Sequence, residues 1–167
     1  MNHFEFTGET KVFLGITLKR IKASVSFSTV IKGQIGGWIE KEENLSDNAW
    51  VSGNARVYGN ARVYGNAWVY GDAQVYGDAW VYGDAQVYGD AWEKSPLHIV
   101  LTRWSLTVSS KTIITIGCNS FTVPKWEEKA ETIAQKEGMN VDEITEYKLA
   151  IQYAKQWMAI YCKSKED

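Results

Sequence analysis

The sequence predicts a mainly β protein: a short parallel β-helix of about three coils, with a β module before it and a ββαα cap after it. Three observations support this prediction. A six-residue unit, V-Y-G-[N/D]-A-x, repeats without interruption from Gly53 to Trp92. Short runs of apolar and β-branched residues precede the repeat. Two strand-like runs and two segments of helical periodicity follow it.

Residues 1–36 form the predicted N-terminal β module. The runs FEF, KVFL and ITLKRIKASVSF are rich in strand-forming residues and are separated by Gly and Thr. Lys19, Arg20 and Lys22 form a small basic cluster in the third run. We interpret this cluster as the solvated face of a strand rather than as a phosphate site.

Residues 37–95 form the predicted β-solenoid, because a fixed short period is the signature of stacked coils. Side chains alternate between the two sides of each A-x-V-Y strand. An interior lined with tyrosine would not close, whereas valine and alanine fill a narrow prism. We therefore predict that Val and Ala point inward and that Tyr and x point outward. Gly followed by Asn or Asp supplies the corner, since Gly tolerates a positive φ.

The repeat resembles that of the hexapeptide left-handed parallel β-helices, in which three hexads make one triangular coil. The resemblance implies left-handed coils, an exception to the usual crossover rule. Residues three hexads apart then stack on one another. The predicted faces are Trp50, Trp68 and Gln86; Arg56, Gln74 and Trp92; and Arg62 with Trp80. The predicted tyrosine pairs are Tyr58 with Tyr76, Tyr64 with Tyr82, and Tyr70 with Tyr88.

Residues 96–167 form the predicted α+β cap. Pro96 ends the repeat, and two strands joined near Ser109–Ser110 follow. Thr122 is expected to cap a helix that ends at Gly138, and Asp142 to cap a second one. The apolar stripe of the second helix is Ile144, Tyr147, Ile151, Ala154, Met158 and Tyr161. We expect this module to dock on the end of the solenoid, because solenoids need capping units.

The aromatic residues carry the functional signal. The chain has eight Trp and nine Tyr, and ten of them lie between Trp50 and Trp92. At roughly 150–250 Å² each, they exceed the apolar patch that a monomer normally exposes. A flanking module, a second subunit or a partner should therefore cover part of them. The predicted binding residues are Trp68, Tyr70, Trp80, Tyr82, Tyr88 and Trp92, with Arg56 and Arg62 as charged partners.

No pattern in the sequence predicts catalysis, a cofactor or a metal site. The repeat contains no His, and the two histidines, His3 and His98, belong to no nucleophile motif. Cys118 and Cys162 are far apart and are expected to be buried or half-buried free thiols. A net charge of −2 argues against bulk binding to nucleic acid or anionic membrane. The absence of a signal sequence and of a long apolar run predicts a cytoplasmic protein.

Four stretches outside the plain repeat carry a second resemblance: FTGETKVFLGITLKRIKA, GGWIEKEENLS, GDAWEKSPL and KTIITIGC. They resemble segments of a phage- and prophage-encoded group of hexapeptide-repeat proteins. The resemblance implies a small accessory protein of the host bacterial cytoplasm, and no catalytic residues carry over. By analogy with other small phage proteins, we expect an inhibitor of host defence that acts by binding. The expected target is a defence protein or, as a slightly less favoured alternative, a nucleotide signal held between subunits of a homo-oligomer. For a nucleotide, the positive charge would come from Arg56, Arg62, Lys19, Arg20 and Lys22.

Two other interpretations remain open. The aromatic faces can serve a self-assembling structural protein, whose basic first coils and acidic last coils suit head-to-tail contact. A relative of the hexapeptide acyltransferases, with His98 as its candidate base, is the less favoured alternative.

Overall fold

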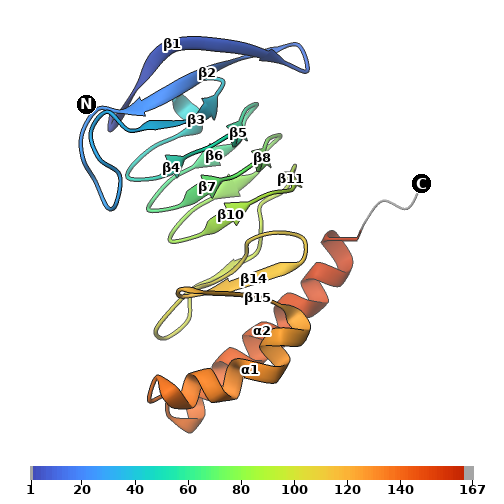
Figure 1. Ribbon diagram of the computed structural model, residues 1–167. Helices are drawn as coiled ribbons and strands as arrows, with labels where there is room; N and C mark the ends of the chain where they lie inside the picture. Colours follow the sequence, from blue (N-terminus) through green and yellow to red (C-terminus); the bar gives the residue numbers. More distant parts are fainter. Residues whose placement is uncertain (1, 164–167) are drawn as a thin grey trace. The chain divides into compact units, whose positions relative to one another are not determined.

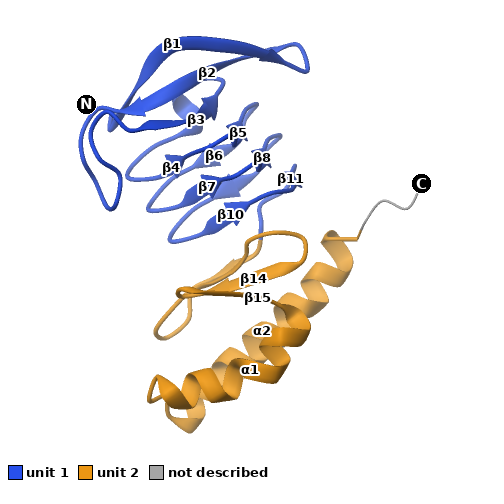
Figure 2. Cartoon of the chain, viewed as in Figure 1, with its two compact units in different colours: residues 1–96 blue, residues 97–167 orange. Residues whose placement is uncertain are grey.

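The computed structural model describes residues 2–163, and the chain divides into two compact units, residues 1–96 and residues 97–167 (Figure 2). The first unit holds the solenoid. Its elements are β1 (Phe4–Phe13), β2 (Ile16–Ala23), β3 (Ile35–Ile39), the 3-10 turn η1 (Glu42–Asn44), β4 (Trp50–Val51), β5 (Arg56–Val57), β6 (Arg62–Val63), β7 (Trp68–Tyr70), β8 (Gln74–Val75), β9 (Trp80–Val81), β10 (Gln86–Tyr88) and β11 (Ala91–Trp92).

The solenoid has three faces, each a stack of short parallel strands from successive coils (Figure 1). One face contains β3, β5, β8 and β11, a second β4, β7 and β10, and a third β6 and β9. Within them Trp50 pairs with Trp68, Arg56 with Gln74, and Arg62 with Trp80. The predicted stacking of residues three hexads apart is confirmed at these positions.

Valine and alanine fill the interior of the solenoid, as predicted. Val51, Val57, Val69, Val75 and Val87 are completely buried, and the alanines from Ala49 to Ala85 are too. The coils are joined by backbone hydrogen bonds that repeat at each level, such as Trp50 N to Ala67 O and Trp68 N to Ala85 O. Small interior side chains fit the narrow cross-section of the solenoid, while the backbone hydrogen bonds join successive coils.

The N-terminal β module is a hairpin that extends one solenoid sheet. β1 pairs antiparallel with β2, and β2 pairs antiparallel with β3, so the sheet of β3, β5, β8 and β11 grows to six strands. The segment after β2 covers a second face, where the Phe27 ring lies 5.7 Å from that of Trp50. Trp50 points outward from its coil and is nevertheless completely buried. A flanking module thus covers part of the aromatic surface.

The last coil departs from the repeat, and the predicted orientation of Trp92 is wrong. Ala91 pairs with Gln74, and Trp92 pairs with Val75, so the chain has slipped by one position. Gln74 N consequently donates to Asp90 O. In the preceding coil the equivalent donor, Arg56 N, bonds to Ala73 O, the oxygen of an alanine position. Asp90 has a positive φ of 36°, which the other corner Asn and Asp residues of the repeat do not show. The slip turns Ala91 outward and buries Trp92, which is only 5% exposed, in the valine position.

The second unit is a four-stranded antiparallel sheet with two helices. Its strands lie in the order β12 (His98–Ile99), β13 (Leu106–Val108), β14 (Ile113–Ile116) and β15 (Asn119–Thr122), followed by α1 (Val123–Lys136) and α2 (Val141–Tyr161). The sequence predicted two strands here. The first run is interrupted by non-strand residues 100–105, and the turn at Gly117 adds β15 as a further strand.

The two helices begin and end close to the predicted residues. Thr122 is the N-cap residue of α1, although its side chain makes no capping hydrogen bond, and Gly138 follows its end with a positive φ. α2 is capped by Asn140 rather than by Asp142. Asn140 accepts a hydrogen bond from Glu143 N, and the Glu143 carboxylate accepts one from Asn140 N.

The helices pack against the sheet through their apolar faces. Trp126 of α1 is buried and donates from Nε1 to Ile114 O at 2.8 Å. Tyr147, Ile151, Ala154 and Met158 of the predicted stripe are buried as well, whereas Tyr161 is 54% exposed. In the part of the chain from residue 2 to residue 163, no helix is both long and apolar enough to cross a membrane.

Candidate functional site

The face formed by β6 and β9 carries the most exposed aromatic residues of the solenoid. Trp80 is 48% exposed and Tyr82 is 38% exposed. Tyr64 contacts both, with its ring 6.1 Å from that of Trp80 and 5.7 Å from that of Tyr82. Arg62 is exposed beside Trp80, its partner in the strand pairing. We call these four residues, Arg62, Tyr64, Trp80 and Tyr82, the Trp80 face.

A second group of predicted residues lies on the face formed by β7 and β10. Trp68, Tyr70 and Gln86 line a pocket of about 500 Å³ together with Ser28, Thr29 and Ser52. Tyr88 stacks on Tyr70 with the ring centroids 5.4 Å apart. Burial, and to a lesser degree the neighbouring Tyr88, raise the pKa of Tyr70. Trp68 and Trp80 therefore lie on different faces, as the predicted stacking placed them.

Arg56 and Trp92 do not belong to either exposed surface. Arg56 is covered in part by the N-terminal hairpin, with its guanidinium carbon 4.3 Å from the centre of the Phe13 ring. Trp92 lies in the solenoid interior and fills the last coil. Trp92 thus contributes to the core, and its assignment to a binding surface is corrected.

The hairpin adds Lys11 to Arg20 and Arg56 around Trp38, and the sequence analysis identified neither Lys11 nor this grouping. Lys11 Nζ lies 4.0 Å from the centre of the Trp38 ring, and the Arg20 guanidinium carbon lies 5.0 Å from the same point. Arg20 and Arg56 flank Trp38 in the sheet. Burial, followed by the positive charges of Arg56 and Arg20, lowers the pKa of Lys11. We call Lys11, Arg20 and Arg56 the Trp38 cluster.

The predicted basic cluster of the third N-terminal run is not assembled as a site. Lys22 pairs with Glu5 at 3.1 Å, and Lys19 Nζ lies 5.1 Å from the centre of the Phe6 ring. Arg20 alone of the three joins the Trp38 cluster, where Glu9 lies 3.7 Å away.

The histidines and cysteines have structural surroundings. His98 Nδ1 shares a hydrogen bond with Thr107 Oγ1 across β12 and β13, and His3 Nε2 shares one with Ala49 O. Neither Cys118 nor Cys162 forms a disulfide, and Cys118 is exposed, contrary to the expected burial. Among the residues that the structure describes, no group of three or more potential side-chain ligands is placed to hold a metal ion.

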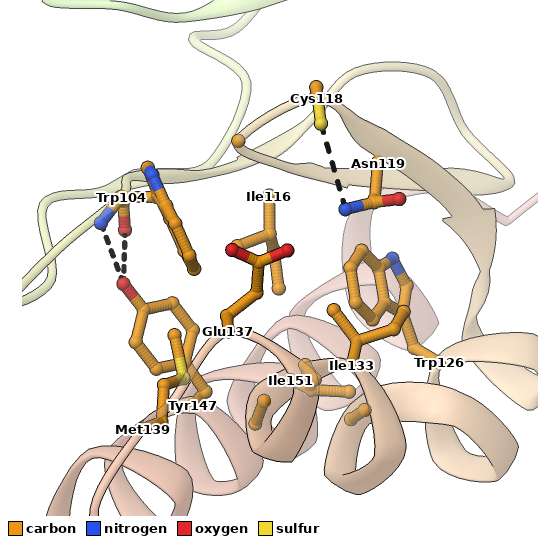
Figure 3. A pocket seen from close by; sticks show the side chains of 13 residues that line it. Trp104, Ile116, Cys118, Asn119, Trp126, Ile133, Glu137, Met139, Tyr147 and Ile151 are labelled. Carbon is orange, nitrogen blue, oxygen red and sulfur yellow. Dashed lines mark hydrogen bonds between the residues drawn. The ribbon is translucent and has the colours of Figure 1, made fainter.

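The second unit contains a pocket that sequence reasoning missed (Figure 3). Its volume is about 350 Å³, and it lies among β14, β15 and the two helices. Figure 3 shows Trp104 and Trp126 on opposite sides, with Glu137 drawn between them. Tyr147 and Met139 complete the wall beside Trp104, and Cys118 and Asn119 lie at the β14–β15 turn.

Hydrogen bonds fix the aromatic walls of this pocket. Tyr147 Oη accepts from Trp104 N at 2.7 Å and donates to Trp104 O at 3.0 Å. The two rings lie 6.3 Å apart. Trp126 is anchored through Nε1 and packs edge-on against Phe121. Trp104 and Tyr147 are far apart in sequence, so no local pattern could have revealed their contact.

The comparisons with known proteins concern the repeat. The model of the family "YdcK Beta solenoid repeat" matches residues 55–71 and 73–89, about a fifth of the chain. Curated proteins yielded no match. The matched segments and the coil geometry agree that this part of the chain is a β-solenoid repeat.

Proposed function

We propose that the chain is a non-enzymatic binding protein that recognises another protein through the Trp80 face and blocks it. The observation that supports this proposal is the exposure of Trp80 and Tyr82 beside Arg62 on a rigid stack of strands. Trp, Tyr and Arg are the residues that dominate the binding energy of protein interfaces. Within the first unit, Trp80 and Tyr82 stay partly exposed, whereas the N-terminal module helps to bury Trp50 completely.

The solenoid favours binding because its surface is ordered before a partner arrives. Tyr64 holds Trp80 and Tyr82 through ring contacts, and the backbone beneath is fixed by inter-coil hydrogen bonds such as Arg62 N to Ala79 O. A preformed aromatic surface loses little conformational entropy on association. The Trp80 face is therefore suited to tight contact without rearrangement of the solenoid.

The test is capture of the partner from a bacterial lysate by wild-type protein and by Trp80→Ala/Tyr82→Ala. We expect the double variant to remain folded and to retain less than about one hundredth of the wild-type affinity, since each hot-spot residue contributes 2 kcal/mol or more. Tyr153→Ala is the matched control because Tyr153 is an exposed aromatic residue of the second unit. Capture that survives the double change, or that Tyr153→Ala also removes, contradicts the proposal.

Substitutions at Trp68 and Trp80 distinguish the two surfaces experimentally. The sequence analysis put Trp68 and Trp80 on different faces but in one set of binding residues, so it predicts that Trp68→Ala/Trp80→Ala abolishes binding in a folded protein. Because the structure puts them on different faces, Trp68→Ala alone should leave capture by the Trp80 face within about threefold of wild type. Circular dichroism of each variant checks the fold.

The finer proposal concerns the partner. The resemblance of residues 6–23, 36–46, 89–97 and 111–118 to phage proteins supports a host defence protein as the target. Bacteria that carry a defence system and express the chain should then give more plaques than bacteria that express Trp80→Ala/Tyr82→Ala. Equal plaque counts for the two proteins would contradict a host defence protein as the target.

A small anionic ligand such as a nucleotide is the second candidate, and the Trp38 cluster favours it. Within residues 2–163, neither Lys11 nor Arg56 lies within ion-pair distance of a carboxylate. Such unpaired cations beside aromatic rings suit a phosphate and a stacked base. Arg62 lies on another face and does not contribute.

Isothermal titration calorimetry with ATP tests this second candidate. Arg56→Gln should weaken binding about tenfold, because it removes one charge-assisted contact of about 1.5–3 kcal/mol. Arg62→Gln, the same substitution at the same repeat position, should leave binding unchanged. Equal effects of the two substitutions, or the absence of heat with wild-type protein, would exclude a nucleotide site at the Trp38 cluster.

A further inference from the structure

We propose that the pocket of the second unit binds an organic ammonium ion with an apolar or aromatic body. This inference is independent of the Trp80 face, because the pocket is built entirely from residues 104–151. It depends on three properties of the pocket: its aromatic walls, its single charge and its size.

The walls of the pocket present aromatic rings from different directions. Trp104, Trp126 and Tyr147 all line it, and Met139 adds a polarizable sulfur. The face of an aromatic ring attracts a cation, and several rings around one volume form the kind of cage that recognises alkylammonium groups. Because Tyr147 Oη is bonded to the backbone of Trp104, the Tyr147 ring is held in place without a ligand.

Glu137 is the one charged residue that lines the pocket in the described part of the chain. Its carboxylate makes no hydrogen bond or ion pair within residues 2–163, and Figure 3 shows it directed between the two indoles. A negative charge together with aromatic rings favours a cation and disfavours an anion.

Arg103, which bonds to the Glu137 backbone, forms its ion pair with Glu143 and not with Glu137. The Arg103 guanidinium donates to both carboxylate oxygens of Glu143, at 2.7 and 3.1 Å. Its remaining hydrogen bonds go to the backbone oxygens of Glu137 and Gly138, not to the Glu137 side chain. The hydrogen bond to Glu143, followed by the charge of Glu143, raises the pKa of Arg103, and the charge of Glu137 adds only the smallest of these effects. The Glu137 carboxylate therefore keeps its hydrogen-bonding capacity for a ligand.

The size of the pocket limits the ligand to a small molecule. A volume of about 350 Å³ is at the lower end of the range for ligand pockets and accommodates a ring with a short side chain. Ile116, Ile133 and Ile151 line its inner part, so the body of the ligand must be apolar. A peptide segment or a nucleic acid does not fit these limits.

The test compares two probes that differ in charge, 2-phenylethylammonium and the neutral 2-phenylethanol, by calorimetry on the full chain. We expect the ammonium to bind wild-type protein at least about tenfold more tightly than the alcohol. Glu137→Gln should weaken the ammonium about tenfold and leave the alcohol unchanged. Glu128→Gln removes a carboxylate from the same helix outside the pocket and should bind both probes as wild type does.

Alkylation of Cys118 gives a second readout in a Cys162→Ser background. Cys118 is exposed and lines the pocket, so bound ammonium should slow its alkylation, whereas Glu137→Gln should restore the rate at the same ligand concentration. Failure of both probes to bind, equal affinity of the two probes, or unchanged ammonium affinity in Glu137→Gln would overturn the inference. None of these outcomes depends on binding at the Trp80 face.

Discussion

At position 92 the indole fills the place that valine fills in the coils above it. The slip that brings it inward leaves Trp92 Nε1 buried without a hydrogen-bond partner, a cost that burial of the large ring offsets. At Trp80, by contrast, nearly half of the side-chain surface remains in solvent. The same residue type in the same repeat thus supports the core at one position and faces solvent at the other.

The contrast between Trp92 and Trp80 gives a stability prediction. Trp92→Ala should lower the free energy of unfolding of the solenoid by about 3–5 kcal/mol, since it removes a buried aromatic side chain. Trp80→Ala should lower it by less than about 1 kcal/mol. Urea unfolding followed by circular dichroism measures both. Equal losses would mean that Trp92 does not fill the interior of the last coil.

Gly65 and Gly89 occupy equivalent corners of the repeat and differ in what lies beneath them. Both have a positive φ, of 73° and 59°. A Cβ on Gly65 would lie 3.1 Å from the nitrogen of Gly83, whereas a Cβ on Gly89 would meet nothing within 4 Å. The corners of the inner coils are therefore restricted by the next coil as well as by their own dihedral angles.

The two corners predict different costs for the same substitution. Gly89→Ala should destabilise by about 1–2 kcal/mol through its left-handed conformation alone. Gly65→Ala should cost at least about 1 kcal/mol more, because the neighbouring backbone must also move. Thermal unfolding of the two variants compares them directly. A smaller loss of stability in Gly65→Ala than in Gly89→Ala would contradict the close stacking of the corners.

The start of α2 depends on the ionised form of Glu143. The hydrogen bond from Arg103 and, less strongly, the one from Asn140 N lower the pKa of Glu143 below its usual value of 4.5. The unfolded chain therefore binds a proton more readily than the folded chain. The resulting stabilisation is complete above the unfolded pKa and is lost as the pH falls through the folded one.

Glu143→Gln should consequently flatten the pH dependence of the helical unfolding transition as the pH falls below the unfolded pKa of Glu143, about 4.5. Asp142→Asn changes an exposed carboxylate of the same helical turn that makes no ion pair in the described structure. The Asp142→Asn variant should keep more of the wild-type pH dependence of unfolding. Denaturant midpoints at several pH values provide the measurement, and an unchanged profile in Glu143→Gln would contradict this role.

The period of the repeat was sufficient to predict which side of each strand faces inward, because every inner coil repeats the same packing problem. It was insufficient at Trp92, where no further coil of the repeat follows to impose the register. The cap of α2 was predictable in principle: Asn140 stands three residues before Glu143, the spacing of a capping box, which Asp142 does not satisfy. The pocket was not predictable, because Trp104 and Tyr147 meet only through tertiary hydrogen bonds.

The chain combines two compact units, a β-solenoid and an α+β unit. The hairpin contributes Lys11 and Arg20 to the Trp38 cluster and covers Arg56 in part. The following segment contacts Trp50, while Trp80 and Tyr82 remain partly exposed. Self-assembly through that face is the main competing account, since a second copy of the chain would also cover it.

Native mass spectrometry of the chain with its captured partner decides between these accounts. We expect wild-type protein to form a complex with a different protein, and Trp80→Ala/Tyr82→Ala to give only the mass of the unbound chain in its own oligomeric state. A complex that persists in the double variant would contradict recognition through the Trp80 face. A homo-oligomer that the double variant dissociates would instead assign the face to self-association.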